Sequence, residues 1–367
     1  MSFFTSKLFT SPEKSVIGVD IGASSLKIVQ IRQKKGRAVL ETYGQIGLGP
    51  YNKLAVGQVV NLSPGEITNV IKDLIKGAEI SSMKGGMSIP LKLSLITLLD
   101  IPKVEGQDLN TIIPIEARKY IPIPINEVTM DWFVIPEIED SSVEYMNDAV
   151  NNSSQRIKVL LVAMHNQVLN NYTTIVKDSG LETEFFEVES FATARGSLIG
   201  ETDPVMIIDF GATGVKTYMI DGGLLVSSHI INRGGQDITF SISKGLNTTF
   251  DQAEHLKRNL GNGNVADEAK ILDLISIHTE YIFSEIQLTL SAFQKKNNKT
   301  ISKIILTGGG SSLKSFKPDL EKKMTCKVEF ADPFSKLETP AFLAESLKTT
   351  GLSFTTAIGL ALRALQD

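Results

Sequence analysis

The feature of this sequence that most constrains its fold is a pattern that occurs twice. Residues 16–31 read VIGVDIGASSLKIVQI, and residues 205–220 read VMIIDFGATGVKTYMI. The two segments align without a gap, and the aligned polar and small residues are Asp20 with Asp209, Gly22 with Gly211, Ala23 with Ala212, Ser24 with Thr213, and Lys27 with Lys216. A duplication of this length predicts two halves built on the same supersecondary unit.

Each copy has the pattern of a strand, a tight turn and a second strand, because β-branched apolar runs flank a Gly-Ala-Ser/Thr segment. One interpretation is a simple β-hairpin, in which Asp and Gly are ordinary turn residues. The other is a turn whose backbone N–H groups and hydroxyls bind a phosphate, with Asp20 and Asp209 facing a bound Mg²⁺. Two copies in one register favour the phosphate interpretation.

A third glycine-rich element lies near the end of the chain, where residues 304–313 read IILTGGGSSL. The pattern predicts a strand, a turn and a helix from about Leu313, and the turn residues are Gly308, Gly309, Gly310 and Ser311. Glycines leave room for a flat ring against the backbone at a helix N-terminus. A further pair, Gly234 and Gly235, precedes another predicted helix. Neither the P-loop nor the Rossmann glycine pattern occurs in the repeated turns.

Residues 250–261, FDQAEHLKRNLG, have a helical pattern that ends at a glycine. Glu254 and Lys257 lie three residues apart and therefore share one helix face. They could contact a ribose and cover a purine, or form a solvent-exposed ion pair. Residues 266–293 predict a long helix with an apolar core stripe.

Composition excludes several classes of function. The chain has 367 residues, enough for two or three domains, and a net charge of −4 without a long basic run, which gives nucleic-acid binding no electrostatic support. A single cysteine, Cys326, excludes an internal disulfide and a cysteine metal cluster. The four histidines have no ligand-like spacing. No apolar run approaches the 20 or so residues that span a bilayer.

The region between the two copies has its own character. Residues 89–136 contain six Ile-Pro dipeptides, which predict strands and loops with short helices. A helix is expected over residues 108–120, with Pro114 at its start or at a kink. We expect a surface hairpin loop over 137–155, a strand over 159–163 and a helix over 166–179. The only tryptophan, Trp132, lies in an alternating run and is expected to be packed.

Together these motifs resemble the superfamily of actin, Hsp70 chaperones and hexokinase. The two D-x-G hairpins resemble its two phosphate motifs, and the TGGG turn its adenosine motif. FFEVESFATARG (185–196) resembles its first connecting helix, and GLSFTTAIGLALR (351–363) its last. The resemblance implies an α/β actin-like (ribonuclease H-like duplicated) fold, with two domains that each have a central mixed sheet and helices.

Within the superfamily the chain most resembles the PilM family of type IV pilus assembly, and next the FtsA family. EARKYIPIPINEV (116–128), INRGGQDIT (231–239) and ADPF (331–334) carry this resemblance. It implies an FtsA-type 1C subdomain inserted in the first domain. The implied organisation is a flexible segment 1–14, subdomain 1A over 15–86, 1C over 87–180, a connecting helix in 181–203, domain 2 over 204–345, and a C-terminal helix in 346–367 that returns to 1A.

The resemblance also implies residue roles. Asp20 and Asp209 would be outer-sphere partners of Mg²⁺. The phosphates of ATP would lie at Gly22, Ala23, Ser24, Ser25 and Lys27, and at Gly211, Ala212 and Thr213. Gly234, Gly235, Glu254, Lys257 and residues 308–311 would lie on the adenosine side. Glu189 would be a general base or a brace of the connecting helix, and Lys27 could instead face solvent.

The implied function is that of an ATP-binding cytoplasmic scaffold of the pilus inner-membrane platform. Its partner would be the cytoplasmic N-terminal peptide of a PilN-like membrane protein, which would recruit it to the inner membrane without a span of its own. ATP with Mg²⁺ would hold the cleft closed, with at most slow hydrolysis. The alternatives are a self-associating, filament-forming protein like FtsA, or a component of a related type II secretion or competence platform.

Overall fold

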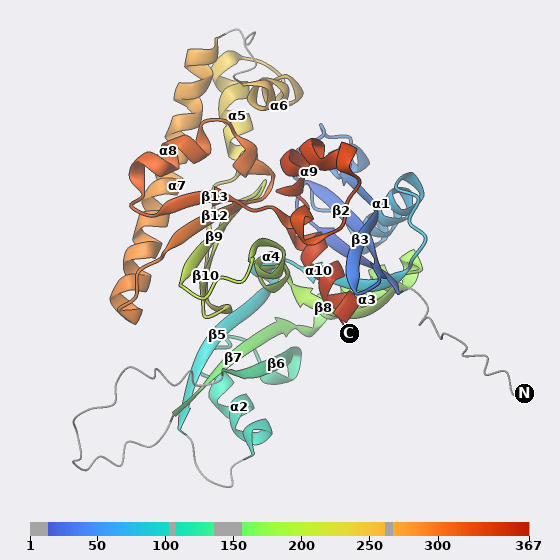
Figure 1. Ribbon diagram of the computed structural model, residues 1–367, viewed down its shortest axis with the longest axis vertical. Helices are drawn as coiled ribbons and strands as arrows, with labels where there is room; N and C mark the ends of the chain where they lie inside the picture. Colours follow the sequence, from blue (N-terminus) through green and yellow to red (C-terminus); the bar gives the residue numbers. More distant parts are fainter. Residues whose placement is uncertain (1–13, 103–107, 136–155, 261–266, 367) are drawn as a thin grey trace, which may run out of the picture.

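The fold is taken from a computed structural model, which describes residues 14–102, 108–135, 156–260 and 267–366. Figure 1 shows two larger α/β units next to each other and a smaller unit, formed by β5, β6, β7 and α2, that extends from them. Among the described residues, the strands form two five-stranded sheets and one three-stranded sheet. The C-terminus lies in the first unit, close to the strands that begin the chain.

The first sheet has the strand order β3-β2-β1-β4-β8. Its strands are β1 (Ser15–Ile21), β2 (Ser25–Lys34), β3 (Arg37–Gly47), β4 (Lys84–Ile89) and β8 (Glu182–Val188). β1, β2 and β3 are antiparallel neighbours, whereas β4 and β8 continue the sheet in parallel. A parallel step needs a crossover connection, and the helix α1 (Pro64–Gly77) supplies the one from β3 to β4.

The second sheet repeats this arrangement in the order β11-β10-β9-β12-β13. Its strands are β9 (Val205–Phe210), β10 (Val215–Asp221), β11 (Leu224–Ile231), β12 (Lys303–Thr307) and β13 (Lys327–Phe330). Three antiparallel strands again precede two parallel ones. The predicted duplication is therefore confirmed, and so is the strand, turn and strand of each copy. The register also repeats, since Asp20 pairs with Lys27 in the first hairpin and Asp209 with Lys216 in the second.

Helices cover both faces of the first sheet. Alternate residues of β1 point to opposite faces, so Ile17, Val19 and Ile21 pack in one core with α1 and α3 (Asn166–Ser179), and Val16 packs in another with α10 (Thr355–Gln366). Helix α10 also crosses α4 (Glu189–Ser197), and a Cβ at Gly359 would lie only 1.9 Å from the Ala192 carbonyl oxygen.

The second sheet has one face in a large core and the other in a smaller one. The large core contains Ile208, Phe210 and Phe283 and involves the helices α5 (Gly235–Leu246), α6 (Phe250–Asn259), α7 (Glu268–Asn297) and α8 (Phe316–Lys323). On the opposite face, Ile207 packs with Ala194 of α4. Because α4 packs against elements of both units, it fixes where the two sheets meet. Helix α9 (Ala344–Gly351) leads back to the first unit.

The inserted region forms the three-stranded antiparallel sheet β5-β7-β6. Its strands are β5 (Ser94–Pro102), β6 (Val128–Ile135) and β7 (Arg156–His165), and α2 (Leu109–Ala117) packs on one face with Trp132 partly buried beneath it. The strand predicted over 159–163 and the helix over 166–179 are both present. Pro114 lies inside α2, whose N-cap is Asp108. Helix α3 packs in the core of the first unit.

Three segments differ from expectation. Residues 185–188 belong to strand β8, so the connecting helix begins only at Glu189. The turn after β12 forms a short 3₁₀ helix, and α8 starts at Phe316 instead of about Leu313. Helix α2 ends at Ala117, before the expected Tyr120. The predicted hairpin loop over 137–155 and the glycine expected to end α6 lie outside the described residues.

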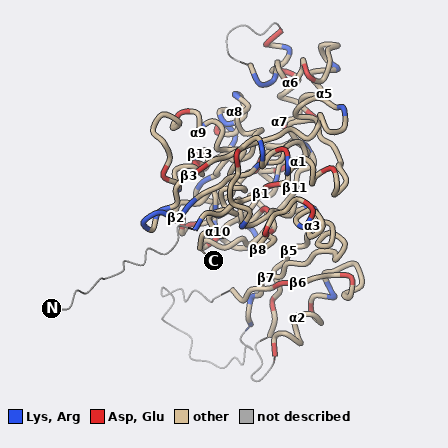
Figure 2. Tube along the Cα trace, turned by 90° about the vertical axis from the view of Figure 1, so that its right-hand side faces the viewer, with Lys and Arg blue, Asp and Glu red and all other residues tan. Residues whose placement is uncertain are grey.

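The short 3₁₀ helices connect these elements and are η1 (Gly49–Asn52), η2 (Leu91–Leu93), η3 (Ile125–Glu127), η4 (Gly309–Ser312), η5 (Pro333–Lys336) and η6 (Ala341–Leu343). In Figure 2 basic and acidic residues are spread over the molecule, and a short basic stretch that includes Lys34, Lys35 and Arg37 lies at the turn between β2 and β3. None of the helices in the described part of the chain has both the length and the apolar content that crossing a membrane requires.

Candidate functional site

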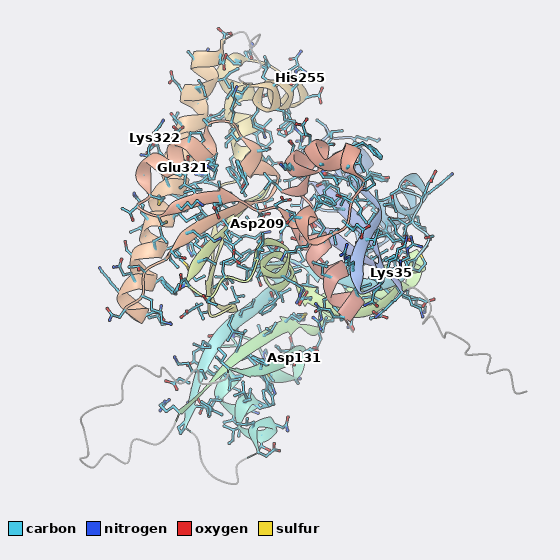
Figure 3. All side chains as sticks on the ribbon, in the orientation of Figure 1. Lys35, Asp131, Asp209, His255, Glu321 and Lys322 are labelled. Atoms are coloured by element: carbon cyan, nitrogen blue, oxygen red, sulfur yellow. The ribbon has the colours of Figure 1, made fainter. Side chains whose placement is uncertain are left out.

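A cavity of about 1680 Å³ lies between the two units, and both repeated turns line it. Figure 3 shows Asp209 at this junction, whereas His255 and Lys322 lie away from it on the second unit. Most of the residues singled out from the sequence line the cavity: Asp20, Gly22, Ala23, Ser24, Ser25, Lys27, Glu189, Asp209, Gly211, Ala212, Thr213, Gly235, Glu254, Lys257, Gly308, Gly309 and Gly310. Residues distant in sequence therefore form one site.

Two of the singled-out residues do not line the cavity. Ser311 is fully buried and donates a hydrogen bond from Oγ to the Thr307 carbonyl oxygen, at 2.5 Å. The neighbouring Ser312 lines the cavity. Gly234 is buried beneath the second turn, where a Cβ would lie 2.3 Å from the Ala212 carbonyl oxygen. Both residues pack against the turns on the side away from the cavity.

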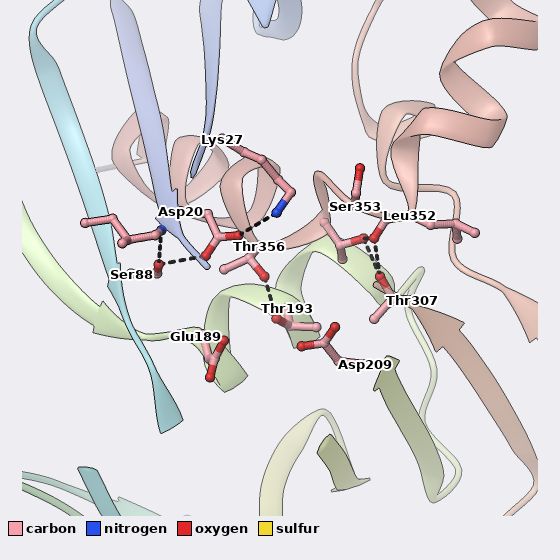
Figure 4. A network of polar contacts seen from close by, with 12 residues as sticks. Asp20, Lys27, Ser88, Glu189, Thr193, Asp209, Thr307, Leu352, Ser353 and Thr356 are labelled. Atoms are coloured by element: carbon pink, nitrogen blue, oxygen red, sulfur yellow. Dashed lines mark hydrogen bonds and ion pairs between the residues drawn. The ribbon is translucent and has the colours of Figure 1, made fainter. Parts of the chain in front are cut away.

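The first turn is closed by its own backbone. The Gly22 N–H donates to the Ser25 carbonyl oxygen at 3.0 Å, which brings the end of β1 and the start of β2 together at the cavity. Asp20 is 7% exposed and accepts a 2.8 Å hydrogen bond from Ser88 Oγ of β4. Lys27 Nζ lies 3.8 Å from Asp20 Oδ2, and its side chain is only 12% exposed. Lys27 therefore faces the cavity and not bulk solvent (Figure 4).

The second turn has the same construction with shorter ionic contacts. The Gly211 N–H donates to the Gly214 carbonyl oxygen at 3.0 Å. Lys216 Nζ donates to Asp209 Oδ2 at 3.2 Å and to Glu189 Oε2 at 2.6 Å. Burial works against the ammonium charge, but the Asp209 and Glu189 carboxylates hold the pKa of Lys216 well above its usual range. Lys216 is thus charged at neutral pH and connects the second unit to α4 of the first.

Glu189 lies at the start of α4 with both carboxylate oxygens occupied. Oε1 accepts a 2.7 Å hydrogen bond from the Leu91 N–H, and Oε2 receives the Lys216 ammonium. Burial raises the pKa of Glu189, the Asp209 carboxylate raises it further, and Lys216 opposes both. A raised carboxyl pKa beside a cavity suits a general base. The two occupied oxygens suit a brace between α4, η2 and β10, and proton transfer from water would require Lys216 to move.

The third glycine element lies against an aromatic side chain. A Cβ at Gly310 would be 2.4 Å from the Phe210 ring, so only glycine fits there. Thr307, at the end of β12, donates from Oγ1 to the Leu352 carbonyl oxygen at 3.0 Å (Figure 4). The Gly308 N–H donates to the same oxygen at 2.8 Å. The turn is therefore held against the segment that precedes α10.

Glu254 and Lys257 form a partly buried ion pair at 2.6 Å on α6, not a solvent-exposed one. Thr239 Oγ1 donates to Glu254 at 2.6 Å, and Lys257 Nζ donates to the Gly235 carbonyl oxygen at 3.0 Å. Burial would raise the pKa of Glu254, but Lys257, Thr239 and Arg258 together lower it. Burial lowers the pKa of Lys257, and Glu254 offsets this only in part. The pair fixes α6 against the N-terminus of α5.

This donor set fits a polyphosphate with a divalent cation. Two glycine turns, two lysines and two carboxylates converge on one cavity from opposite units. The described residues contain no group of three His, Cys, Asp or Glu side chains that could hold a metal by themselves. Mg²⁺ is usually held through one or two carboxylates and the phosphates of a ligand, with waters between, and Asp20 and Asp209 match that pattern.

Several cavity residues were not identified from the sequence. Lys216 is one of them, although its alignment with Lys27 in the repeated pattern is a signal that could have identified it. Gln236, Lys314 and Tyr172 also line the cavity. Gln236 lies within the INRGGQDIT segment, which gave no role for its side chain, and Lys314 and Tyr172 belong to no recognisable motif, because long-range packing brings them to the cavity.

The curated relatives of the chain include cell division proteins. It is 24% identical over 358 residues to FtsA of Staphylococcus epidermidis, which covers 88% of this chain and 75% of the relative. It is 26% identical over 322 residues to FtsA of Neisseria meningitidis, which covers 78% of this chain and 71% of that protein.

Solved structures agree with the predicted fold class. A chain of a PilM-PilN type IV pilus biogenesis complex superposes with a TM-score of 0.79 at 22% identity, covering 97% of this chain and 100% of that one. MreB 5 of Spiroplasma citri bound to AMPPNP gives a TM-score of 0.53 at 11% identity, with 95% of each chain covered. At these identities the likeness concerns the fold, and it confirms an actin-like α/β architecture.

A comparison of the sequence with known protein families identifies the family of the chain. The family described as type IV pilus assembly protein PilM matches residues 18–365, from the first repeated hairpin to the last turn of α10. The match includes both glycine turns, the inserted three-stranded sheet and the glycines after β12. The chain therefore belongs to the type IV pilus assembly protein PilM family.

Proposed function

We propose that this protein is an ATP-binding scaffold of the type IV pilus inner-membrane platform, in which Mg-ATP holds the two units together. The observation that carries the proposal is the pair of matched turns, each with an Asp–Lys pair in the same register, that face one cavity from opposite units. A ligand with several negative charges can contact both turns at once. Its binding free energy then favours the closed arrangement of the units.

Each part of the cavity has a role in this proposal. Backbone N–H groups and hydroxyls of residues 22–25 and 211–213 would bind phosphate oxygens, with Lys27 and Lys216 balancing their charge. Asp20 and Asp209 would bind waters of the magnesium ion. The glycines 308–310 and the Glu254–Lys257 pair would contact adenosine. Bound Mg²⁺ would neutralise phosphate charge, and Glu189 would remain hydrogen-bonded to Leu91.

We further propose that the inserted sheet binds the cytoplasmic N-terminal peptide of a PilN-like inner-membrane protein, which would recruit the chain to the membrane. One of the similar solved structures is a PilM-PilN type IV pilus biogenesis complex. In this chain β6 is an edge strand of the inserted sheet, and an unpaired edge can accept an extended peptide. Phe133 of β6 is 52% exposed on the face opposite to the packed Trp132, which offers an apolar contact.

A peptide pulldown tests the partner. The N-terminal peptide of the PilN-like protein encoded beside this one would be immobilised, with a scrambled peptide as the reference, and binding would be measured with and without Mg-ATP. Retention of the chain on the first peptide alone supports the proposal. Phe133→Asp should reduce binding, whereas Phe342→Asp, at a side chain 85% exposed outside the inserted sheet, should not. Equal retention on both peptides would refute it.

A second candidate is a filament-forming protein, favoured by the similarity to FtsA over 88% of this chain. Such a protein would self-associate in a nucleotide-dependent way. Sedimentation with and without ATP distinguishes the two, because a scaffold that binds one peptide per chain should stay in the supernatant. Nucleotide-dependent pelleting would favour the filament.

A further inference from the structure

A loop of the first unit lines the cavity and contacts the second unit. We call residues 53–62, between η1 and α1, the cross-cleft loop. The Val59 N–H donates a 2.8 Å hydrogen bond to Gln236 Oε1, although the two residues are 177 positions apart in the chain. Gln236 is the second residue of α5 and belongs to the second unit. This contact is therefore a direct bond between the units at the edge of the cavity.

The same bond lies in a continuous chain that joins the two repeated turns. On the first unit, the Val60 N–H donates to the Ala23 carbonyl oxygen at 3.3 Å, and the Leu48 N–H to that of Ser24 at 2.9 Å. On the second unit, the Gln236 N–H donates to the Ala212 carbonyl oxygen at 3.0 Å. The residue after Val59 is therefore bonded to the first turn, and Gln236 itself is bonded to the second.

The cross-cleft loop also lies close to α6 at Gly57. Gly57 has a φ of +88°, and a Cβ there would lie 3.3 Å from Arg258 Nη2 and 3.4 Å from Glu254 Oε1. Because Gly57, Val59 and Gln236 all line the cavity, the loop forms part of the cavity wall. A side chain at Gly57 would strain the backbone and would come close to the Arg258 and Glu254 side chains of α6.

We propose that Gln236 is a positioning residue that couples occupancy of the two turns to closure of the cavity through the cross-cleft loop. The inference rests on the proposed nucleotide binding. A ligand that contacts both turns keeps Val59 and Gln236 at bonding distance, and the bond in turn slows separation of the units. Gln236 therefore acts on the dissociation rate, because the bond must break before the units separate, whereas association starts from the open arrangement.

The test is stopped-flow kinetics of a fluorescent ATP analogue with Mg²⁺, using the whole chain. Gln236→Met keeps the length of the side chain but removes the acceptor oxygen. Loss of one hydrogen bond predicts dissociation about fivefold faster, with the association rate changed less than about twofold. Gln294→Met, at an exposed position of α7, is the matched control and should leave both rates unchanged.

Gly57→Ala perturbs the cross-cleft loop where it lies close to α6, and it should also accelerate dissociation of the nucleotide. Its control is Gly36→Ala, because Gly36 has a similar φ of +78° with no atom within 4 Å of the added Cβ. The two alanines carry the same kind of backbone strain, and only the first lies against α6. Faster dissociation in Gly57→Ala alone assigns the effect to the cross-cleft contact.

Hydrogen exchange of the ligand-free chain gives a readout that does not depend on nucleotide. Gln236→Met should accelerate exchange in the peptide covering residues 53–62, because the Val59 N–H loses its acceptor, and Gln294→Met should not. Normal ATP binding by wild type with unchanged dissociation in Gln236→Met would overturn the coupling alone. Absence of ATP binding by wild type would overturn the proposed function and the coupling together.

Discussion

The Lys216 ammonium lies 3.2 Å from the Asp209 carboxylate, in the register in which Lys27 faces Asp20 in the other unit. The two pairs differ in two ways. The Lys27–Asp20 distance is longer, at 3.8 Å, and Lys216 has a second partner, Glu189, at 2.6 Å. Lys216 thus connects β10 of the second unit with α4, whereas the ion pair of Lys27 with Asp20 lies within the first unit.

Lys216→Met should weaken both ATP binding and folding. It removes a positive charge from the phosphate side and leaves the buried Glu189 carboxylate and the partly buried Asp209 carboxylate without their cation, so we expect affinity about tenfold weaker or more and unfolding easier by about 3 kcal/mol. Calorimetry and urea unfolding measure these quantities. Lys299→Met, which removes a half-exposed lysine paired with Asp221, should change stability by less than about 1 kcal/mol. Equal behaviour of the two variants would contradict the assignment.

Asp209→Asn should reduce the effect of Mg²⁺ on ATP affinity. In wild type both carboxylates favour the metal-bound nucleotide, so chelation of Mg²⁺ should weaken binding, whereas in the variant, where only Asp20 remains, the weakening on chelation should be smaller. Titration calorimetry with Mg²⁺ or EDTA provides the comparison. Asp203→Asn, at an exposed position before β9, is the control and should keep the wild-type dependence. A full metal effect in Asp209→Asn would remove Asp209 from the site.

Turnover of ATP should be slow. Both oxygens of Glu189 are occupied, by the Leu91 N–H and by Lys216, so activating a water requires an ion pair to open first. We expect steady-state phosphate release below about 1 per second. Glu189→Gln should lower any residual rate, and Glu184→Gln, exposed on β8, should not. Release at ordinary enzyme rates would show that Glu189 is free to act as a base.

The duplicated hairpins and the glycine turn after β12 could be predicted from local sequence patterns, because each segment contains its own strand and turn residues. The actin-like architecture was predicted from the resemblance of these motifs to a known superfamily. The partners of Glu189 could not be predicted in this way, since Leu91 and Lys216 come from other segments and meet it only after both sheets are folded. The same holds for the Val59–Gln236 bond. The segment 185–188 was expected to be helical, but it pairs with β4, and tertiary pairing decided its structure.

Gly310→Ala should destabilise the chain, whereas Gly309→Ala should be tolerated. A Cβ at Gly310 would lie 2.4 Å from the buried Phe210 ring, whereas the nearest atom to one at Gly309 is Ser353 Cβ at 4.0 Å. Overpacking of this kind costs about 1–3 kcal/mol. Chemical unfolding of both variants measures the difference. If the two curves coincide, the turn adjusts to a side chain more easily than its packing implies.

The stability of the fold should depend on pH through Glu254. Folding lowers the pKa of Glu254, whose ordinary value is 4.5. A group with a lowered pKa in the folded state contributes stability that is fully present above its ordinary pKa and is lost as the pH falls through the folded value. Wild type should therefore lose stability as the pH falls below the ordinary value of 4.5, partly through this carboxylate, whose hydrogen bonds to charged and hydroxyl donors contribute about 1–3 kcal/mol.

Glu254→Gln should accordingly be less stable than wild type at pH 7 and depend less on pH below 5. Urea unfolding at a series of pH values measures both effects. The control is Glu280→Gln, because Glu280 forms an ion pair with Lys323 but is 57% exposed, and screening by solvent should leave its pH dependence close to wild type. A Glu254→Gln curve parallel to that of wild type from pH 7 to pH 3 would mean that the Lys257 and Thr239 contacts do not stabilise the charged form.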